Sequence, residues 1–152
     1  MTEPKHHNVF IATPAFGYQT FVNYTNSLIK LLSTPPPADI KFSTTIHLHS
    51  GSAMISHARN DCVKHFLDGT YTKMLFIDAD IGFEPNDFWR LLRRDEDIAF
   101  APYITKNISG PANSKFVLKF KDPDNKVVQS DGFIEALSLS LIHISEPTRQ
   151  FR

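Results

Sequence analysis

The sequence contains a single cysteine, Cys62, among its 152 residues, so the chain cannot form an internal disulfide. A lone thiol fits a reducing compartment. No apolar run is long enough to cross a bilayer. Residues 1–8 are polar and lack the apolar core of a signal peptide. We therefore expect a cytoplasmic protein without a membrane span.

The chain also has no excess charge of either sign, because Lys and Arg together number 16 and Asp and Glu together number 16. A general nucleic-acid or membrane-surface binder would show a basic excess, so neither partner is expected. A hydrophobic content of 41% with 12% aromatic residues is ordinary for a globular protein. The length suits one domain with a sizeable core.

Two phosphate-binding patterns are missing: the Gly-x-Gly-x-x-Gly of dinucleotide folds and the Gly-Lys-Ser/Thr of P-loop proteins. In their place, residues 13–17 (Thr-Pro-Ala-Phe-Gly) follow the first apolar run. We expect this segment to be a loop at the edge of a sheet, where it could hold a base or a ribose. The alternative is a plain turn between a strand and a helix.

Apolar runs and helical periodicity alternate along the chain. Strands are predicted over residues 8–13, 40–49, 73–78 and 97–104, helices over 18–33 and 56–68, a short helix from Glu84 and Pro85, and a hairpin over 115–121 and 126–129. This alternation predicts an α/β fold with a mostly parallel sheet flanked by helices, similar to the nucleotide-binding half of a Rossmann-like fold.

The most informative segment is an apolar run, residues 74–77, that leads directly into Asp78 and Asp80. The run predicts a strand buried on both faces. Side chains two apart on a strand point the same way, so both carboxylates should reach one ion. A hard cation, Mg²⁺ or Mn²⁺, uses such ligands together with water and phosphate oxygens. The alternative is ordinary turn or cap chemistry.

A second candidate group opens a predicted helix at residues 56–60 (Ser-His-Ala-Arg-Asn). Ser56 is expected to cap the helix, whose free N–H groups and dipole attract anions. Arg59 adds a permanent charge and a fork of donors that suits phosphate, and Asn60 can orient hydroxyl groups. The alternative is an Arg that faces solvent and an Asn bonded within its own turn.

His47 and His49 share one face of a predicted strand, a pattern that can bind zinc. No Cys or Glu cluster with suitable spacing completes such a site in the sequence, so we expect packing or surface histidines. Cys62 falls at a core position of its helix and is not expected to act as a nucleophile.

These features occur together in an order that resembles the GT-A glycosyltransferases, especially family-2-like enzymes of bacteria and large DNA viruses. The resemblance covers about residues 8–134, and its motifs are residues 10–14, 58–60, 75–83 and 101–106. The Arg-Asn pair combined with the acid-tipped strand is the most specific part, and the Thr-Pro segment is the weakest.

The resemblance implies a hexosyltransferase-type enzyme with a nucleoside diphosphate sugar (UDP- or GDP-linked) as donor and an unknown acceptor. The donor-binding residues would be Thr13, Pro14, Ala15, Arg59, Asn60 and Asp78. Asp78 and Asp80 would bind Mn²⁺ or Mg²⁺ that bridges the diphosphate. The catalytic base would lie further along the chain than the region of resemblance.

Residues 139–149 look like the translation of a transposase sequencing adapter, because all eleven match in one reading frame. We therefore expect residues 1–138 to be the donor-binding part of a GT-A domain and residues 139–152 to be a non-native tail. Such a fragment should lack transferase activity. The alternative is a natural strand followed by a turn at Pro147.

Two other classes of protein remain possible. A nucleotidyltransferase-type enzyme also uses metal-binding acids on an α/β sheet, but it normally has a basic, Gly-rich loop after the first strand. Residues 13–17 contain no Lys or Arg. A non-catalytic nucleotide- or sugar-binding module would bind tightly without turnover.

Overall fold

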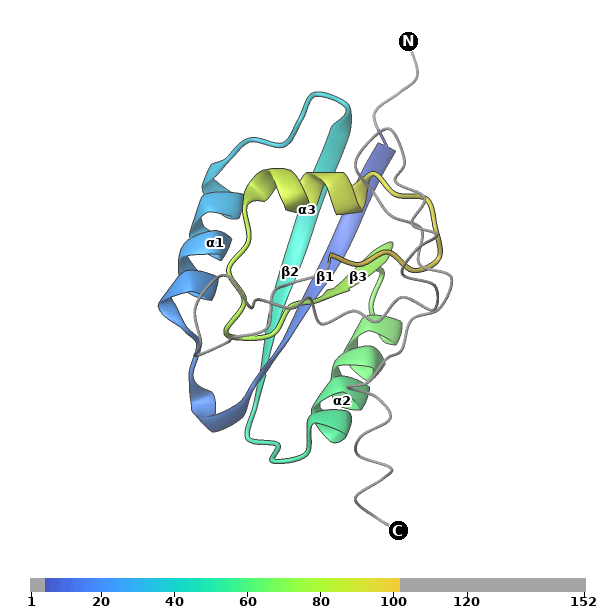
Figure 1. Ribbon diagram of the computed structural model, residues 1–152. Helices are drawn as coiled ribbons and strands as arrows, with labels where there is room; N and C mark the ends of the chain where they lie inside the picture. The colour runs from blue at the N-terminus through green and yellow to red at the C-terminus, as the bar shows by residue number, and fades with distance from the viewer. Residues whose placement is uncertain (1–4, 102–152) are drawn as a thin grey trace, which may run out of the picture. The chain divides into compact units, whose positions relative to one another are not determined.

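The computed structural model describes residues 5–101, which form a parallel sheet flanked by helices (Figure 1). The strands are β1 (Lys5–Ala15), β2 (Ile40–Ser50) and β3 (Lys73–Phe76), in the sheet order β2-β1-β3. The helices are α1 (Val22–Ser33), α2 (Ile55–Leu67) and α3 (Pro85–Leu92), with a short 3₁₀ turn, η1 (Phe16–Tyr18), after β1. The predicted α/β class with a mostly parallel sheet is confirmed.

Both pairings of β1 are parallel, so the three strands run in one direction. β1 pairs with β2 from Lys5 opposite Ile40 to Ala15 opposite Ser50, and with β3 as far as Ala12 opposite Phe76. The Ile77 N–H donates to the Ala12 carbonyl at 3.1 Å and extends this second ladder by one bond. The carboxyl ends of all three strands therefore lie toward one edge of the sheet.

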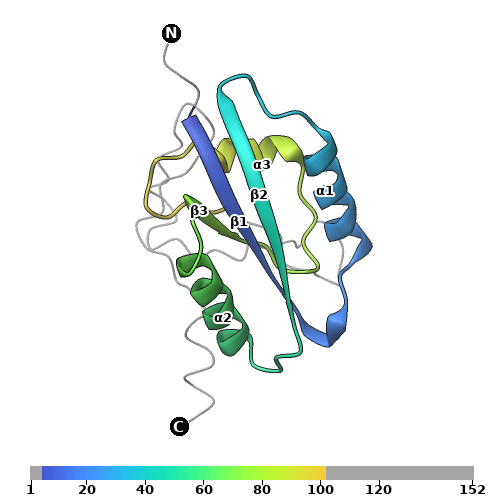
Figure 2. The same cartoon turned by 180° about the vertical axis from the view of Figure 1, so that it is seen from behind.

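The two faces of β1 build two separate cores. Val9 and Ile11 pack with side chains of α1 and α3, and we call this cluster the α1/α3 core. Phe10 and Ala12 pack with Cys62 of α2, and we call this cluster the α2 core. α3 crosses in front of β2 in Figure 1 and behind it in the reverse view of Figure 2. Because successive side chains of β1 point to opposite faces of the sheet, α1 and α3 pack on one face and α2 packs on the other.

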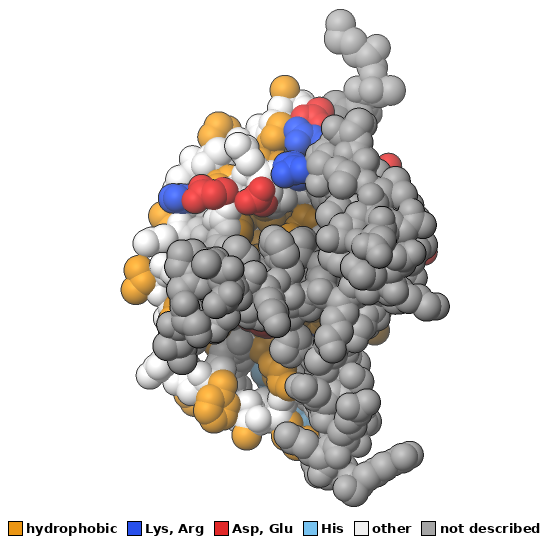
Figure 3. All heavy atoms as spheres, in the orientation of Figure 1, with side chains coloured by type: hydrophobic (Ala, Val, Ile, Leu, Met, Phe, Trp, Pro, Cys, Tyr) orange, Lys and Arg blue, Asp and Glu red, His pale blue; other side chains and the backbone are white. Residues whose placement is uncertain are grey.

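α3 is amphipathic. Its inward side chains Phe88, Trp89 and Leu92 are buried. Lys, Arg, Asp and Glu side chains gather around α1 and α3 on the face shown in Figure 3. Lys30 of α1 pairs with Glu84, the N-cap of α3, at 2.9 Å, and Arg90 pairs with Asp87 within α3 at 3.9 Å. This division of apolar and charged sides holds α3 against the sheet.

The strand buried on both faces is β1 and not, as predicted, β3. Residues Val9 to Ala12 of β1 are at most 2% exposed. The first three side chains of β3 are half-buried, and Phe76 is 38% exposed. β3 pairs on one side only within the described residues, so its apolar run is less covered than that of the central strand.

Other predicted boundaries shift for local reasons. α1 begins four residues later than expected because Gly17 and Tyr18 have positive φ angles of 72° and 60°, which no α-helix accommodates. Met54, not Ser56, is the N-cap of α2. Residues 97–101 of the predicted strand 97–104 do not form a strand, and Ile98 is 72% exposed, so no burial holds an extended segment there.

Several expectations lie outside the described residues: positions 102–104, the hairpin, and the tail from residue 139. Among the described residues, no helix has both the length and the apolar character that crossing a membrane requires.

Candidate nucleotide and metal site

Asp78 and Asp80 lie in a turn and not on a strand. β3 ends at Phe76, and the Ile81 N–H donates to the Asp78 carbonyl at 3.0 Å. We call residues 78–81 the acid turn. The prediction that strand alternation aligns the two carboxylates is therefore wrong, because the chain has left the ladder after Ile77. Both acids are half-buried, at the carboxyl edge of the sheet.

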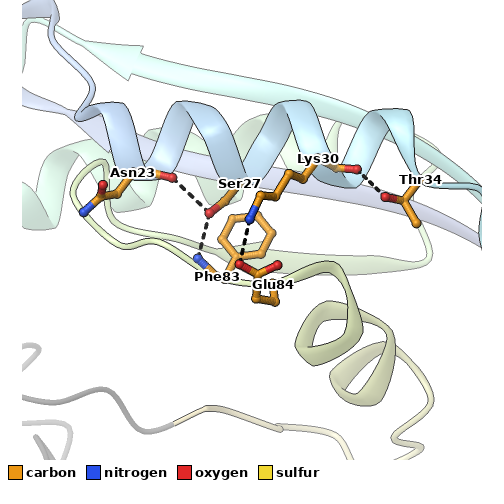
Figure 4. Close-up of polar contacts among 6 residues, drawn as sticks. All are labelled: Asn23, Ser27, Lys30, Thr34, Phe83 and Glu84. Carbon is orange, nitrogen blue, oxygen red and sulfur yellow. Dashed lines mark hydrogen bonds and ion pairs between the residues drawn. The ribbon is translucent and has the colours of Figure 1, made fainter.

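α1 and its N-cap residue, Phe21, hold the acid turn and the segment after it in place. The Phe21 N–H donates to the Ala79 carbonyl at 2.9 Å. Ser27 Oγ accepts from the Phe83 N–H at 2.8 Å and donates to the Asn23 carbonyl at 2.9 Å (Figure 4). The same figure shows Lys30 Nζ against Glu84 Oε1, at 2.9 Å. Contacts from successive turns of one helix thus fix where the acids stand.

Close packing supports these bonds. A Cβ placed on Gly82 would lie 3.3 Å from the Asn23 Cβ and 3.7 Å from Ser27 Oγ. The first distance is tighter than ordinary contact, so a larger residue at position 82 would press the segment away from α1. The absence of a side chain here lets the acid-bearing segment approach the helix closely.

Replacing Ser27 with alanine should lower the free energy of unfolding by about 1–2 kcal/mol, because the half-buried Phe83 N–H loses its acceptor. The measurement is urea denaturation followed by circular dichroism. Ser33→Ala is the matched control, since Ser33 is exposed at the end of the same helix. Equal stability losses in the two variants would show that Ser27 does not anchor the segment.

Arg59 and Asp78, predicted from separate motifs, are in contact. Arg59 Nη2 lies 3.2 Å from Asp78 Oδ1, and the two side chains are 23% and 37% exposed. The guanidinium also lies over the Phe76 ring, 5.9 Å from its centroid, as in a cation–π contact. Its Nε is buried and has no hydrogen-bond partner among the described residues. Asn60, the next residue on α2, is exposed.

Residues Thr13 to Ala15 are not a loop, contrary to the prediction. They continue β1, paired with Leu48 to Ser50 of β2, and all are buried. Thr13 Oγ1 lies 2.6 Å from the Tyr24 hydroxyl, and burial raises the pKa of Tyr24 although this hydrogen bond opposes the rise. The Thr13 side chain is thus engaged with α1 instead of joining Arg59 and Asp78.

Pro14 can extend a central strand here because of where β3 stops. The Asn8 and Ala12 carbonyls accept bonds from Thr72 and Ile77, so alternate residues of β1 bond toward β3. Pro14 is the next residue of β1 in that series, and it comes after Ala12, the last residue of β1 that is paired with β3. Its missing N–H therefore costs no ladder bond.

The loop at this edge begins instead at η1. It exposes two aromatic side chains that were not among the residues predicted from sequence to bind the donor. Phe16 is 76% and Tyr18 is 79% exposed. The Tyr18 hydroxyl lies 3.0 Å from the position of a Cβ on Gly51, just beyond β2. Exposed rings are suited to stack against a base. The signal in the sequence was the pair of aromatics around Gly17.

A second group of metal-ligand side chains lies on the face of the sheet that α2 covers. One ligand atom from each of His47, His49 and Cys62 lies within 4.8 Å of the other two. Cys62 thus lies beside the His-x-His pair, which the spacing of residues in the sequence did not indicate, and the expectation of packing or surface histidines stays a prediction. Spacing along the chain did not reveal Cys62, because its helix is folded back over β2. Cys62 is fully buried, as its core position predicted.

Comparison with known proteins gives no match: no family profile fits the chain, and no curated protein or solved structure matches it. A functional proposal therefore depends on the motifs in the sequence and on the contacts described above.

Proposed function

We propose that this chain is the donor-binding half of a metal-dependent glycosyltransferase of the GT-A type. Its reaction would move a sugar from a nucleoside diphosphate sugar to an acceptor. The observation that carries the proposal is the 3.2 Å contact between Arg59 and Asp78 beside the acid turn. It joins an anion-binding group to a metal-binding group at the sheet edge where open α/β folds bind ligands.

The donor atoms at this edge fit a hard cation. Asp78 and Asp80 offer carboxylate oxygens, and Mg²⁺ or Mn²⁺ completes its shell with water and phosphate oxygens. When bound, the cation would neutralise charge on the diphosphate. The Arg59–Asp78 contact balances the carboxylate in the absence of a cation, and it places the guanidinium beside the same site.

Arg59 is suited to stabilise the leaving group. Sugar transfer builds negative charge on the nucleoside diphosphate, and a fixed guanidinium stabilises charge where it develops. Its buried, unpartnered Nε leaves a donor for an anionic ligand. Phe16 and Tyr18 would stack on the base or ribose at the ends of β1 and β2. No described residue is assigned the role of catalytic base.

Nucleotide titration separates this proposal from its alternatives. Binding of UDP, GDP, UTP and GTP to the protein would be measured by isothermal calorimetry with and without Mn²⁺. A glycosyltransferase donor site should bind a diphosphate in a Mn²⁺-dependent way. Preference for a triphosphate would favour a nucleotidyltransferase. Tight binding of a free sugar or nucleotide without any metal dependence would favour a binding module.

Replacing Arg59 with glutamine should weaken Mn²⁺-dependent diphosphate binding by about 10- to 100-fold, because a charge-assisted hydrogen bond to phosphate is lost. Arg90→Gln is the matched control, since Arg90 lies on the solvent side of α3. Calorimetric titration of the variants measures the effect. If Arg59→Gln binds as tightly as Arg90→Gln does, the guanidinium does not face the diphosphate.

A further inference from the structure

We propose that His47, His49 and Cys62 form a second metal site, specific for a transition-metal ion such as Zn²⁺ and separate from the acid turn. The three ligand atoms lie within 4.8 Å of one another. Ligands of a filled tetrahedral zinc site are roughly 3.3–3.8 Å apart, given Zn–N and Zn–S bonds of about 2.0–2.3 Å. Small side-chain rotations would therefore close the group around an ion.

Regular secondary structure supplies all three ligands. His47 and His49 are two residues apart on β2 and point to the same face. Cys62 lies in the middle of α2 and is fully buried in the α2 core. The His47 ring stacks on Phe10 with centroids 5.5 Å apart, which fixes its plane. Ligands held by a strand and a helix keep their spacing better than ligands on loops.

An independent observation points to a ligand at this place. His47 Nε2 is buried and has no hydrogen-bond partner among the described residues. Buried polar atoms are nearly always satisfied, so an unpaired ring nitrogen beside a cysteine calls for an explanation. A metal ion would satisfy it. Burial, followed by the nearby His65 and His49, lowers the pKa of His47.

The Cys62 thiol has to lose its proton when a metal ion binds. Burial raises the pKa of its thiol, with Asp61 adding to the rise and Arg59 opposing it. A neutral cysteine thiol packs as a small apolar group. Metal binding would exchange the thiol proton for the ion and release that proton to solvent.

The surroundings resemble the outer shell of a metal site. Asp61 Oδ2 lies 3.6 Å from His49 Nε2, which is beyond hydrogen-bond distance, so the ring or the carboxylate would have to rotate slightly before Asp61 could orient the ring as an outer-shell partner does. His65 is close to His47, with ring centroids 4.6 Å apart, but its Nδ1 lies 2.7 Å from the Asp61 carbonyl oxygen. His65 is not part of the three-residue group, so we assign the fourth position to water.

The ligand types decide which ions fit. Imidazole nitrogen and thiolate sulfur favour Zn²⁺ and Co²⁺, whereas Mg²⁺ and Mn²⁺ favour oxygen. The chain would then bind soft and hard cations at different places. This inference does not depend on the proposed transferase function, because it uses none of the residues of the acid turn.

Titration with Co²⁺ alone tests the proposal, because a Co²⁺–thiolate bond gives an absorption band that no imidazole or carboxylate site produces. We expect the unmodified protein to bind one equivalent with this band, and Zn²⁺ to displace it. Cys62→Ser should remove the band. His49→Ala should weaken Co²⁺ binding by on the order of 100-fold. Circular dichroism checks that both variants are folded, and His49 is near enough to the surface to tolerate truncation.

Two matched controls complete the experiment. His57→Ala replaces an exposed histidine of α2 outside the group, and Asp78→Asn removes a carboxylate of the acid turn. Both should keep the thiolate band and the affinity of the unmodified protein. Absence of the band in the unmodified protein, or a band and affinity that survive in folded His49→Ala, would overturn the proposal.

Discussion

Replacing Ile11 with alanine should lower the free energy of unfolding by about 2–5 kcal/mol. Ile11 is completely buried in the central strand and belongs to the α1/α3 core, with Tyr24, Leu31 and Trp89. Truncation removes buried methyl groups and leaves a cavity between the sheet and two helices. Because a domain of this size is stable by only about 5–15 kcal/mol, the loss would be a large fraction of the total.

Urea denaturation of the variant would measure this loss, with Ile29→Ala as the matched control. Ile29 carries the same side chain on α1 but is 57% exposed. Its replacement should change the free energy of unfolding by less than about 1 kcal/mol. Similar losses at both positions would mean that β1 is not the centre of the core.

The order of strands and helices could be predicted because apolar periodicity records burial directly. Residues 8–13 were predicted as a strand from their apolar run, and they form the middle of β1. The degree of burial could not be predicted in the same way. Residues 74–77, before the acids, are as apolar as residues 9–12 of β1. The order of the strands in the sheet decides which strand is central, and no local sequence pattern encodes that order.

The two candidate sites were predictable to different extents. Arg59 and Asp78 were chosen for their chemistry at the ends of predicted elements, and parallel strands bring such ends together. The burial of Thr13 was not foreseeable, because it depends on Tyr24 reaching back from α1. Cys62 joins two histidines only because α2 returns over β2, a contact between elements that sequence spacing does not reveal.

Asp78→Asn and Asp80→Asn should each abolish Mn²⁺-dependent binding of nucleoside diphosphates. Each change removes one negative charge with almost no change of shape. A neutral amide in place of one of the two carboxylates is too weak a ligand to compete with water for a hard cation. The fold should persist, because backbone groups, the Ala79 carbonyl and the Phe83 N–H, bond the acid turn and the segment after it to Phe21 and Ser27.

The measurement is calorimetric titration of UDP and GDP with and without Mn²⁺, and Asp87→Asn is the matched control. Asp87 is a 57% exposed acid on α3, so the same substitution there should leave Mn²⁺-dependent binding intact. Asp78→Asn also weakens the attraction that positions Arg59, so it should reduce metal-free nucleotide binding as well. If both variants retain Mn²⁺-dependent binding equal to that of Asp87→Asn, the acid turn is not the metal site, and the donor-binding proposal fails with it.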